Sequence, residues 1–549
     1  MSSPVDTTFV SGTTITSSWL NGVNDHVNNI EADPHPIYAQ DTQLAASSGA
    51  SLIGFTQAGT GAVIKTVQDK LRETVSVKDF GAVGDGVTND TAAISSAVTY
   101  VLGLSKSPTL YFPAGHYILT ALPTITNAIT FRADNPRDTQ LLLSGTTNVI
   151  NVQGSGTRAT DVVFDSIGIN GSSMTNGYCL SVDFAQNVLL NNVLINNPYN
   201  GIYVRQTGNI TFRDCEFDYI RGTVGVDLYG DNTTRNGEND QIDLVIFDNT
   251  TIQSNLPASG GTNSSILLRI DGRVHTIQTD GLRLLNGGVG LQTKNTPGLA
   301  SNLIPRFLIG SSLEVENMYA ECLDLQSIRE FTPAFLFAVG SHTADGIKLS
   351  SNVARFSPAN CSINSNQLHG LNSNGAASVL LNKPLVYNNS LVGNNVKSGV
   401  YASGSGLLQI EGGLSGKETT LPAYTENQKY GIELDGAFSG RLVVTGCDLR
   451  SNATGAIFDN TTTSTGSNVS ACPGYNPIGT SLQVVGASPY VYTSGLTLES
   501  INLYGGTGVV STISGVAIAN ASPCSFVMQP RQSVTITYAT VPTMAINKA

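Results

Sequence analysis

The sequence predicts an all-β chain whose centre is a solenoid of parallel coils, a parallel β-helix, and three observations lead to this fold class. Two short phrases of alternating apolar residues recur irregularly from Asp161 to about Asp459. The composition is turn-rich, with 57 Gly residues, 12% charged residues and 40% hydrophobic residues, and it argues against wholesale disorder. An amphipathic helix at residues 89–104 precedes the repeats and can cover the open end of a first coil.

The first phrase consists of two inward apolar residues, a two-residue bend and two more apolar residues. In VVFDSIGIN the pairs are Val162/Phe164 and Ile167/Ile169, and VLLNNVLIN, ITFRDCEFD, VIFDNTTIQ and LVVTGCDLR repeat the pattern. Period-2 strands interrupted by short bends are what one coil of a β-helix requires. The pattern also places Cys215 in an inward position.

The second phrase precedes the first and carries apolar residues two positions apart. It appears as YCLSVD, NGIYVRQ, VGVDLYG, ILLRIDG, GVGLQTK, DGIKLSS, SGVYASG and YGIELDG. The interval between VGVDLYG and ILLRIDG is about twice the others, which predicts an inserted loop that contains GDNTTRNGENDQ. A β-sandwich or a propeller is the competing fold, but both alternate more strictly and need hairpin turns.

Both ends of the predicted solenoid carry a candidate cap. At the start, Val75–Phe80 predicts a short strand, residues 81–90 predict a turn, and the helix that follows has an apolar stripe of Ala93, Ile94, Ala97, Val98 and Val101. TLYFPAGHYILT then predicts a strand, a turn and a second strand. From about Cys472 the repeat stops, and the remaining sequence alternates as a small antiparallel β-sandwich would.

Several of these motifs resemble those of known proteins. VKDFGAVGDGVTND, the helix and TLYFPAGHYILT together resemble the opening of right-handed parallel β-helices of the pectate-lyase-like superfamily, as used in bacteriophage tailspikes. TSSWLNGVN, with Trp19, resembles the head-binding region of tailspikes from short-tailed phages, and DPHPIY resembles a tail-fibre motif. GYNPIG and SPYVYT resemble a C-terminal module found after tailspike β-helices.

The resemblance implies four regions. They are an adaptor for virion attachment at residues 1–30, a neck at 31–72 with a helical stretch TVQDKLRE, a right-handed parallel β-helix at 73–465, and a C-terminal β-sandwich for trimerisation at 466–549. It further implies a homotrimer that binds phage tail or adaptor proteins through its N-terminal segment. Such a protein is assembled in the bacterial host cytoplasm, resides in the virion tail and acts at the host cell surface.

Charge and motifs exclude several classes of function. The net charge of −12 and pI near 4.9 argue against nucleic acid or an anionic membrane as partner. No run of eighteen apolar residues predicts a membrane span, and MSSPVDTTFVSGTT lacks the features of a signal peptide. The seven scattered cysteines predict reduced thiols. GDGVTND lacks the bidentate Glu of a calcium loop, so we expect neither a metal nor a cofactor.

Aligning the second phrases places outward side chains in two columns. The column between the apolar pair holds Ser181, Tyr203, Asp227, Arg269 and Gly290, and the column just after it holds Asp183, Arg205, Tyr229, Asp271 and Gln292. The coil spacing makes Asp227 and Asp271 diagonal neighbours, about 8 Å apart at their Cα atoms. Carboxyl pairs near this separation suit glycoside hydrolysis. We therefore predict Asp227 and Asp271 as an acid–base pair.

The same columns predict the substrate-binding residues. Tyr203 and Tyr229 can stack on sugar faces, and Arg205 and Arg269 can clamp a carboxylate of the sugar; Asp183 completes the set. The alternative is that Asp183–Arg205 and Arg269–Asp271 are solvated ladder pairs of little energetic value.

A reserve acid–base candidate comes from RDCEFDY. Glu216 points outward there beside Asp218, and the next coil offers Thr251 and Gln253, so we expect no cationic partner for these carboxylates on that side. Glu314, Glu316, Glu321 and Asp324 form another acidic patch.

Three functions remain open from the sequence. The resemblance implies a tailspike that binds a bacterial surface polysaccharide (capsule, exopolysaccharide or O-antigen) and depolymerises it, by hydrolysis of glycosidic bonds as our first choice. The second is a polysaccharide lyase that neutralises a uronate with Arg269 or Arg205 and uses a Tyr such as Tyr203 as base. The third is an attachment spike that binds without catalysis.

Overall fold

The computed structural model describes most of the 549 residues. The described residues are 16–18, 20–21, 41–104, 108–231, 234–235, 238–255, 262–296, 304–393, 395–416, 428–461, 467–475 and 479–548. Most of the predicted adaptor, with Trp19, and the DPHPIY motif lie outside them. The chain divides into two compact units, Met1–Val75 and Ser76–Ala549. Within the described part, no helix is both long and apolar enough to cross a bilayer.

The first unit is built from short elements. They are α2 (Asp41–Leu44), a 3-10 helix (Gly49–Leu52), the antiparallel pair β1 (Gly54–Thr56) and β2 (Ile64–Thr66), and α3 (Val67–Leu71). The helix predicted from TVQDKLRE is confirmed as α3, which begins with a capping box between Thr66 and Asp69. Large apolar side chains of this unit are exposed to solvent, among them Val63 (71%) and Ile64 (82%). The described residues of this unit therefore leave apolar surface uncovered.

The second unit opens with the predicted helical cap. The expected strand at Val75–Phe80 is short: β3 (Val75–Ser76) gives way to a 3-10 helix (Val77–Phe80), and the predicted turn contains β4 (Asp85–Asn89). α4 (Thr91–Leu102) buries its predicted stripe, including Ile94 and Val98. Asp90 holds the turn through hydrogen bonds from the N–H groups of Val83 (2.6 Å) and Gly84 (3.1 Å).

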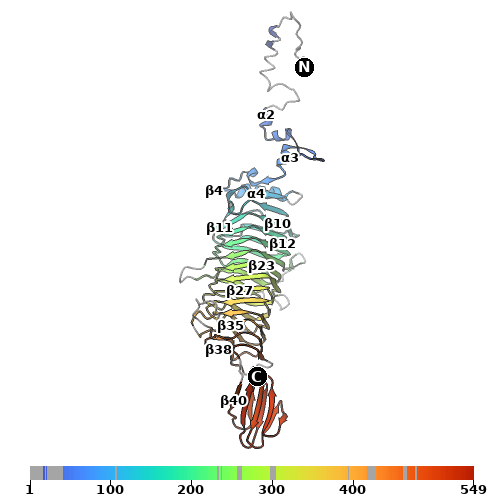
Figure 1. Cartoon of the computed structure of the whole chain (residues 1–549). Helices are drawn as coiled ribbons and strands as arrows, with labels where there is room; N and C mark the ends of the chain where they lie inside the picture. Colours follow the sequence, from blue (N-terminus) through green and yellow to red (C-terminus); the bar gives the residue numbers. More distant parts are fainter. Residues whose placement is uncertain are drawn as a thin grey trace. The chain divides into compact units, whose positions relative to one another are not determined.

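The coils form the predicted parallel β-helix, and its strands belong to one continuous sheet (Figure 1). Each full coil supplies strands to three parallel ribbons, named A, B and C here. Ribbon A contains β9 (Ile150–Gln153), the first part of β12 (Tyr178–Asn191), β14 (Asn200–Thr207), β17 (Val224–Gly230), β22 (Ile266–Gly272), β24 (Val289–Lys294), the first parts of β26 (Leu323–Phe331) and β28 (Ile347–Phe356), β30 (Leu371–Asn374), β33 (Val400–Ser403), β36 (Tyr430–Leu434) and β38 (Gly455–Asp459).

The other two ribbons complete each coil. Ribbon B contains β5 (Thr109–Tyr111), β7 (Ile129–Arg132), β10 (Ala159–Asp165), the second part of β12, β15 (Asn209–Arg213), β20 (Ile242–Asp248), β23 (Val274–Leu285), β25 (Phe307–Glu316), the second parts of β26 and β28, β31 (Ser378–Asn382), β34 (Leu407–Glu411), β37 (Arg441–Thr445) and β39 (Asn468–Ser470). Ribbon C contains β4, β6 (Gly115–Leu119), β8 (Thr139–Gly145), β11 (Gly168–Met174), β13 (Leu194–Asn196), β16 (Glu216–Asp218), β21 (Thr251–Gln253), the ends of β23 and β25, β27 (Phe335–Val339), β29 (Asn360–Asn364), β32 (Leu385–Tyr387) and β35 (Leu414–Gly416).

The bend between ribbons B and C repeats from coil to coil. One residue in each bend has a left-handed backbone: Ser166 (φ 57°), Asn192 (52°), Asp214 (51°), Asn249 (46°) and Gly281 (78°). Asn, Asp and Gly tolerate this conformation best. The side chains also bond from one bend to the next, because Asn192 donates to Ser166 Oγ (3.1 Å) and Asn249 donates to Asp214 Oδ1 (2.6 Å).

The interior of the solenoid is a stack of apolar side chains. Equivalent phenylalanines of neighbouring coils lie nearly parallel, with ring centroids 4.9 Å apart for Phe131–Phe164 and for Phe212–Phe247. This spacing follows from the distance between adjacent strands. Cys215 is buried, as the repeat predicts.

After the last coil the chain forms the predicted antiparallel sandwich. One sheet has the order β40 (Gly479–Gln483), β47 (Thr543–Lys548), β42 (Glu499–Tyr504), β45 (Cys524–Met528), and the other has the order β41 (Tyr490–Thr493), β46 (Ser533–Thr537), β43 (Val510–Ile513), β44 (Val516–Ala519). Arg531 of this region forms an ion pair with Asp459 and donates to Thr461 Oγ1 (2.8 Å).

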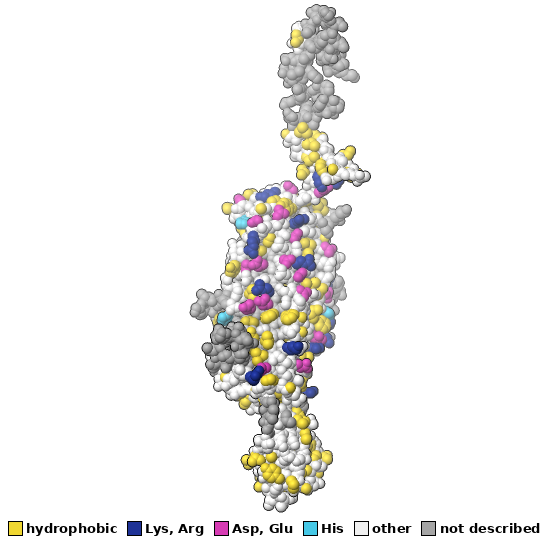
Figure 2. All heavy atoms as spheres, in the orientation of Figure 1, with side chains coloured by type: hydrophobic (Ala, Val, Ile, Leu, Met, Phe, Trp, Pro, Cys, Tyr) yellow, Lys and Arg dark blue, Asp and Glu magenta, His cyan; other side chains and the backbone are white. Residues whose placement is uncertain are grey.

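β39 still pairs with β37, so the coils extend past residue 465, where the sequence predicted their end. On the face drawn in Figure 2, charged side chains are scattered over the coils among uncharged and hydrophobic ones, whereas the sandwich displays hydrophobic and uncharged ones.

Candidate functional site

The predicted columns lie on ribbon A, with one correction. Strand pairing places Ser181, Tyr203, Asp227 and Arg269 in one row across neighbouring coils, and Asp183, Arg205, Tyr229 and Asp271 in the adjacent row. The fifth coil differs from the prediction, because Leu291 lies beside Leu268. Gln292 therefore follows Arg269, and Lys294 follows Asp271. The prediction was wrong by two residues there, and Gly290 is not in the row.

Asp227 is held firmly by its neighbours. Arg269 donates to both of its carboxylate oxygens, from Nε to Oδ1 (2.8 Å) and from Nη2 to Oδ2 (2.5 Å), and the Tyr178 hydroxyl donates to Oδ2 (2.6 Å). Asp227 is 2% exposed. Burial, followed by the charge of Asp227, raises the pKa of Tyr178, so this phenol stays protonated. Burial opposes the charge of Arg269, but the hydrogen bond and charge of Asp227 outweigh it and raise the pKa of Arg269.

Asp271 lies diagonally across from Asp227, as the register predicted, because Asp227 pairs with Arg269 and Tyr229 pairs with Asp271. It is 5% exposed, and its Oδ1 accepts a hydrogen bond from the backbone N–H of Thr296 (2.8 Å). Neither aspartate thus presents an open carboxylate to solvent.

Arg205 binds carboxylates of the inserted loop. The loop forms a small hairpin of β18 (Thr234–Arg235) and β19 (Glu238–Asn239). Arg205 donates from Nε to Asp240 Oδ2 (2.6 Å) and from Nη2 to Asp231 Oδ2 (3.2 Å). Burial raises the pKa of Asp240 to about 6, even though Arg205 opposes the shift. Asp183 accepts a hydrogen bond from Gln153 (3.3 Å).

The tyrosines form an aromatic row across three coils. The ring centroids of Tyr178 and Tyr203 are 5.4 Å apart, and those of Tyr203 and Tyr229 are 6.5 Å apart with a 28° interplanar angle. All three side chains are half-buried. Burial raises the pKa of Tyr203, so it is a poor base at neutral pH. The row offers flat apolar surface with hydroxyl groups at its edge, which suits stacking on sugars.

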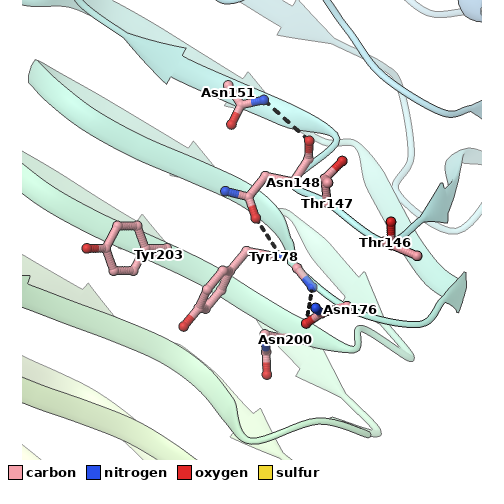
Figure 3. A pocket seen from close by; sticks show the side chains of 9 residues that line it. Thr146, Thr147, Asn148, Asn151, Asn176, Tyr178, Asn200 and Tyr203 are labelled. Atoms are coloured by element: carbon pink, nitrogen blue, oxygen red, sulfur yellow. Dashed lines mark hydrogen bonds between the residues drawn. The ribbon is translucent and has the colours of Figure 1, made fainter.

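A pocket of about 550 Å³ opens beside this row (Figure 3). Tyr178 and Tyr203 form one side, and the rest is lined by amides and hydroxyls from the starts of neighbouring coils: Asn148, Asn151, Asn176, Asn200, Thr146 and Thr147, with Gly177. The sequence analysis did not identify these residues or Tyr178. Tyr178 and Asn200 are paired in register, three positions before Ser181 and Tyr203 of the first column, so extending the alignment that far upstream would have found both.

Glu216 lies away from the predicted pair. It belongs to β16 in ribbon C, whereas Asp227 and Asp271 lie on ribbon A. On the side of the next coil Glu216 pairs with Thr251, as predicted, but Arg137 from an earlier coil donates to its Oε2 (2.8 Å). Burial and the neighbouring Asp218 raise the pKa of Glu216.

A second polar cluster lies further along ribbon A. Glu321 is half-buried beside Lys348 (3.7 Å), and burial raises its pKa. On the next coil Asp345 accepts hydrogen bonds from the His369 backbone N–H (2.9 Å) and from Asn372 (2.8 Å), and it is 7% exposed. The sequence analysis placed Glu321 in an acidic patch but did not identify Asp345 or His369.

His369 continues this cluster on the following coil. Its Nδ1 accepts a hydrogen bond from the backbone N–H of Ser398 (3.0 Å), and its ring lies 4.8 Å from that of Tyr401. Burial lowers the pKa of His369, which keeps the imidazole neutral. In the part of the chain that the structure describes, no cluster of three or more His, Cys, Asp or Glu could hold a metal ion.

Comparison with known proteins agrees with this architecture. Residues 74–131 match the family model "Rhamnogalacturonase A/epimerase, pectate lyase-like". The chain is 25% identical over 204 residues to the tail spike protein of Shigella phage Sf6, covering 35% of this chain and 32% of that protein. It is 34% identical over 97 residues to a K30/K69-specific capsule depolymerase of Klebsiella phage K5-2, covering 18% and 11% of the two chains. The matches thus span about a third or less of these relatives.

A solved structure extends the likeness over most of the chain. Tailspike protein 3 of bacteriophage CBA120 superposes with a TM-score of 0.54 at 15% identity, covering 87% of this chain and 73% of that one. At this identity the likeness supports the fold alone.

The arrangement can bind a polar, ring-shaped ligand along ribbon A. It combines stacking surfaces, neutral hydrogen-bonding groups and, further along, carboxylates in different environments. General acid–base catalysis by two carboxyl groups requires environments that move their pKa values apart.

Proposed function

We propose that the chain is a phage tailspike that binds a bacterial surface polysaccharide along ribbon A and cleaves its glycosidic bonds. The observation that carries this proposal is the row of Tyr178, Tyr203 and Tyr229 beside an amide-lined pocket on the flank of a parallel β-helix. Sequence similarity to a tail spike protein and to capsule depolymerases supports the same class of substrate.

The ion pairs that Arg269 and Arg205 already form favour hydrolysis over β-elimination. A lyase needs a cation that can neutralise the carboxylate of a uronate, together with a base of suitable pKa. Arg269 already binds Asp227, and Arg205 already binds Asp231 and Asp240. The raised pKa of Tyr203 also argues against its action as base.

For hydrolysis, we assign the acid–base roles to Glu321 and Asp345 in place of the sequence-predicted Asp227 and Asp271. The raised pKa of Glu321 suits a general acid. Asp345 lies on the neighbouring coil and accepts two N–H hydrogen bonds, which suits a carboxylate that acts as base or nucleophile. Asp227 differs from Asp345 because a charged guanidinium, that of Arg269, binds both of its oxygens, so Asp227 is better suited to positioning Arg269 and Tyr178.

The partners are part of the same proposal. The exposed Val63 and Ile64 of the first unit, and exposed Val516 and Val527 of the sandwich, are surfaces that further copies of the chain would cover. We therefore propose a homotrimer that is carried in the virion tail and attached through residues 1–30 to tail or adaptor proteins. Assembly in the host cytoplasm and action at the cell surface follow from that role.

The decisive experiment incubates the purified protein with a panel of bacterial capsular polysaccharides. Size-exclusion chromatography would detect chain shortening, and mass spectrometry would identify the released oligosaccharides. We expect products that have gained one water per cleaved bond. Products with the ultraviolet absorbance of an unsaturated uronate would establish a lyase, and binding without shortening would establish a non-catalytic attachment spike.

A further inference from the structure

We propose that the pocket beside Tyr178 and Tyr203 is a subsite for an uncharged sugar residue, a neutral hexose or an N-acetylhexosamine, and not for a uronate. This inference rests on the proposed function, since it names the sugar that the polysaccharide places there. Every side chain that lines the pocket is an amide, a hydroxyl or a tyrosine. Uronate recognition, by contrast, uses a guanidinium or ammonium group.

The amides of the pocket present donors to a ligand. Asn148 uses its side-chain oxygen to accept from the Tyr178 N–H (2.9 Å), and Asn176 uses its oxygen to accept from the Gly177 N–H (2.8 Å) (Figure 3). The oxygen of Asn200 accepts from the N–H groups of Thr223 (2.9 Å) and Val224 (3.2 Å). With these oxygens occupied, the NH₂ groups of the half-buried Asn148 and the exposed Asn176 can donate to a ligand. Such neutral donors match sugar hydroxyls, the ring oxygen and an acetamido carbonyl.

The tyrosines supply the apolar side of the subsite. The Tyr178 hydroxyl is committed to Asp227 (2.6 Å), which fixes the position of its ring. The Tyr203 ring lies 5.4 Å away at an interplanar angle of 40°. The two rings form an angled surface against which the C–H face of a pyranose can pack. A volume of about 550 Å³ leaves room for a sugar with a substituent.

The surrounding charges disfavour a carboxylate in the pocket. Both arginines that act on the pocket tyrosines are already paired: Arg269 binds Asp227, and Arg205 binds Asp231 and Asp240. A carboxylate that entered the pocket would lose water without gaining a counter-ion, and the buried charge of Asp227 would repel it. An uncharged sugar has no charge to desolvate and is not repelled by Asp227.

The test compares the capsular polysaccharide that the wild-type protein shortens with the same polymer after chemical reduction of its carboxyl groups. Binding is measured for the wild type, Tyr203→Ala, Asn176→Ala and Asn176→Lys. Tyr504→Ala, an exposed tyrosine of the sandwich, is the matched control, and circular dichroism checks folding. We expect Tyr203→Ala and Asn176→Ala to weaken binding about tenfold for both polymers, and Tyr504→Ala to bind as the wild type does.

The outcomes separate this inference from the proposed function. If Asn176→Lys binds the native polymer about tenfold more tightly but not the reduced one, a carboxylate occupies the pocket and the inference is overturned. Unchanged binding in Tyr203→Ala and Asn176→Ala, while the polymer is still shortened, would overturn the subsite and leave the depolymerase intact. Failure of the wild type to bind or shorten any polymer would overturn both.

Discussion

Arg269 and Asp227 are joined across neighbouring coils by two hydrogen bonds, Nε–Oδ1 of 2.8 Å and Nη2–Oδ2 of 2.5 Å. Asp227 is almost completely buried, so removal of one partner leaves the other charge without compensation. We expect Arg269→Leu, which leaves the buried Asp227 carboxylate without its cation, to lower the free energy of unfolding by about 3 kcal/mol, measured by denaturant unfolding. The double variant Asp227→Ala/Arg269→Leu should be less destabilised than Arg269→Leu alone. If the two single effects simply add, the pair is not coupled.

The proposed acid–base pair predicts a selective loss of turnover. Glu321→Gln and Asp345→Asn should each lower kcat by about 10²–10⁴-fold while binding persists, because they remove proton transfer. Glu216→Gln is the matched control, since Glu216 lies on ribbon C. Viscosity loss of the capsular polysaccharide would measure the rate. An inactive Asp271→Asn beside a fully active Glu321→Gln would return the assignment to Asp227 and Asp271.

Asp240 predicts a pH dependence of stability. Its pKa is raised to about 6 by burial, with Asp231 adding to the shift and Arg205 opposing it. An acid with a raised folded-state pKa contributes stability that is fully present below its unfolded pKa of about 4 and is lost as the pH rises through the folded value. We therefore expect the Tm of the wild type, relative to Asp240→Asn, to fall between about pH 4 and pH 6. A constant difference between the two proteins over this range would refute the shift.

The close approach of successive coils predicts a sharp effect at Gly201. A Cβ atom there would lie 2.2 Å from the carbonyl oxygen of Gly225 on the next coil, whereas one at Gly455 would meet its nearest neighbour at 3.8 Å. Gly201→Ala should therefore lower the free energy of unfolding by at least about 2 kcal/mol, and Gly455→Ala should change it little. Thermal unfolding followed by circular dichroism compares them. Equal Tm values for the two variants would contradict the predicted packing.

The fold was predictable because each coil repeats a local pattern. Inward residues such as Phe164 and Cys215 recur at fixed positions in the first phrase, and burial of those positions is confirmed. The capping helix was predictable because its apolar stripe has helical spacing. The 3-10 helix at Val77–Phe80 was not predicted, because Val75 and Val77 alternate as in a strand, although the three-residue step from Val77 to Phe80 fits a 3-10 helix better.

The site was predictable only in part. An alternating strand matches its neighbour equally well after a shift of two residues, which explains the wrong placement of Gly290. Spacing makes both Asp227 and Asp271 neighbours of Arg269, and the preference of Arg269 for Asp227 depends on side-chain reach. The pairing of Arg205 with Asp240 does not follow from spacing, because Asp240 lies in the inserted loop. A usable signal was missed: the residue before the glycine in NGI, DGI and HGL falls in one column and includes Asn200, Asp345 and His369.

The hairpin between β17 and β20 leaves ribbon A and returns at the start of ribbon B on the same coil. Its length is therefore independent of the coil-to-coil register, while its Asp240 reaches the ligand-facing row through Arg205. The whole hairpin can therefore be replaced by another sequence without a change in the coils of the β-helix. Under the proposed function, a change in polysaccharide specificity would then require changes in the hairpin and none in the coils.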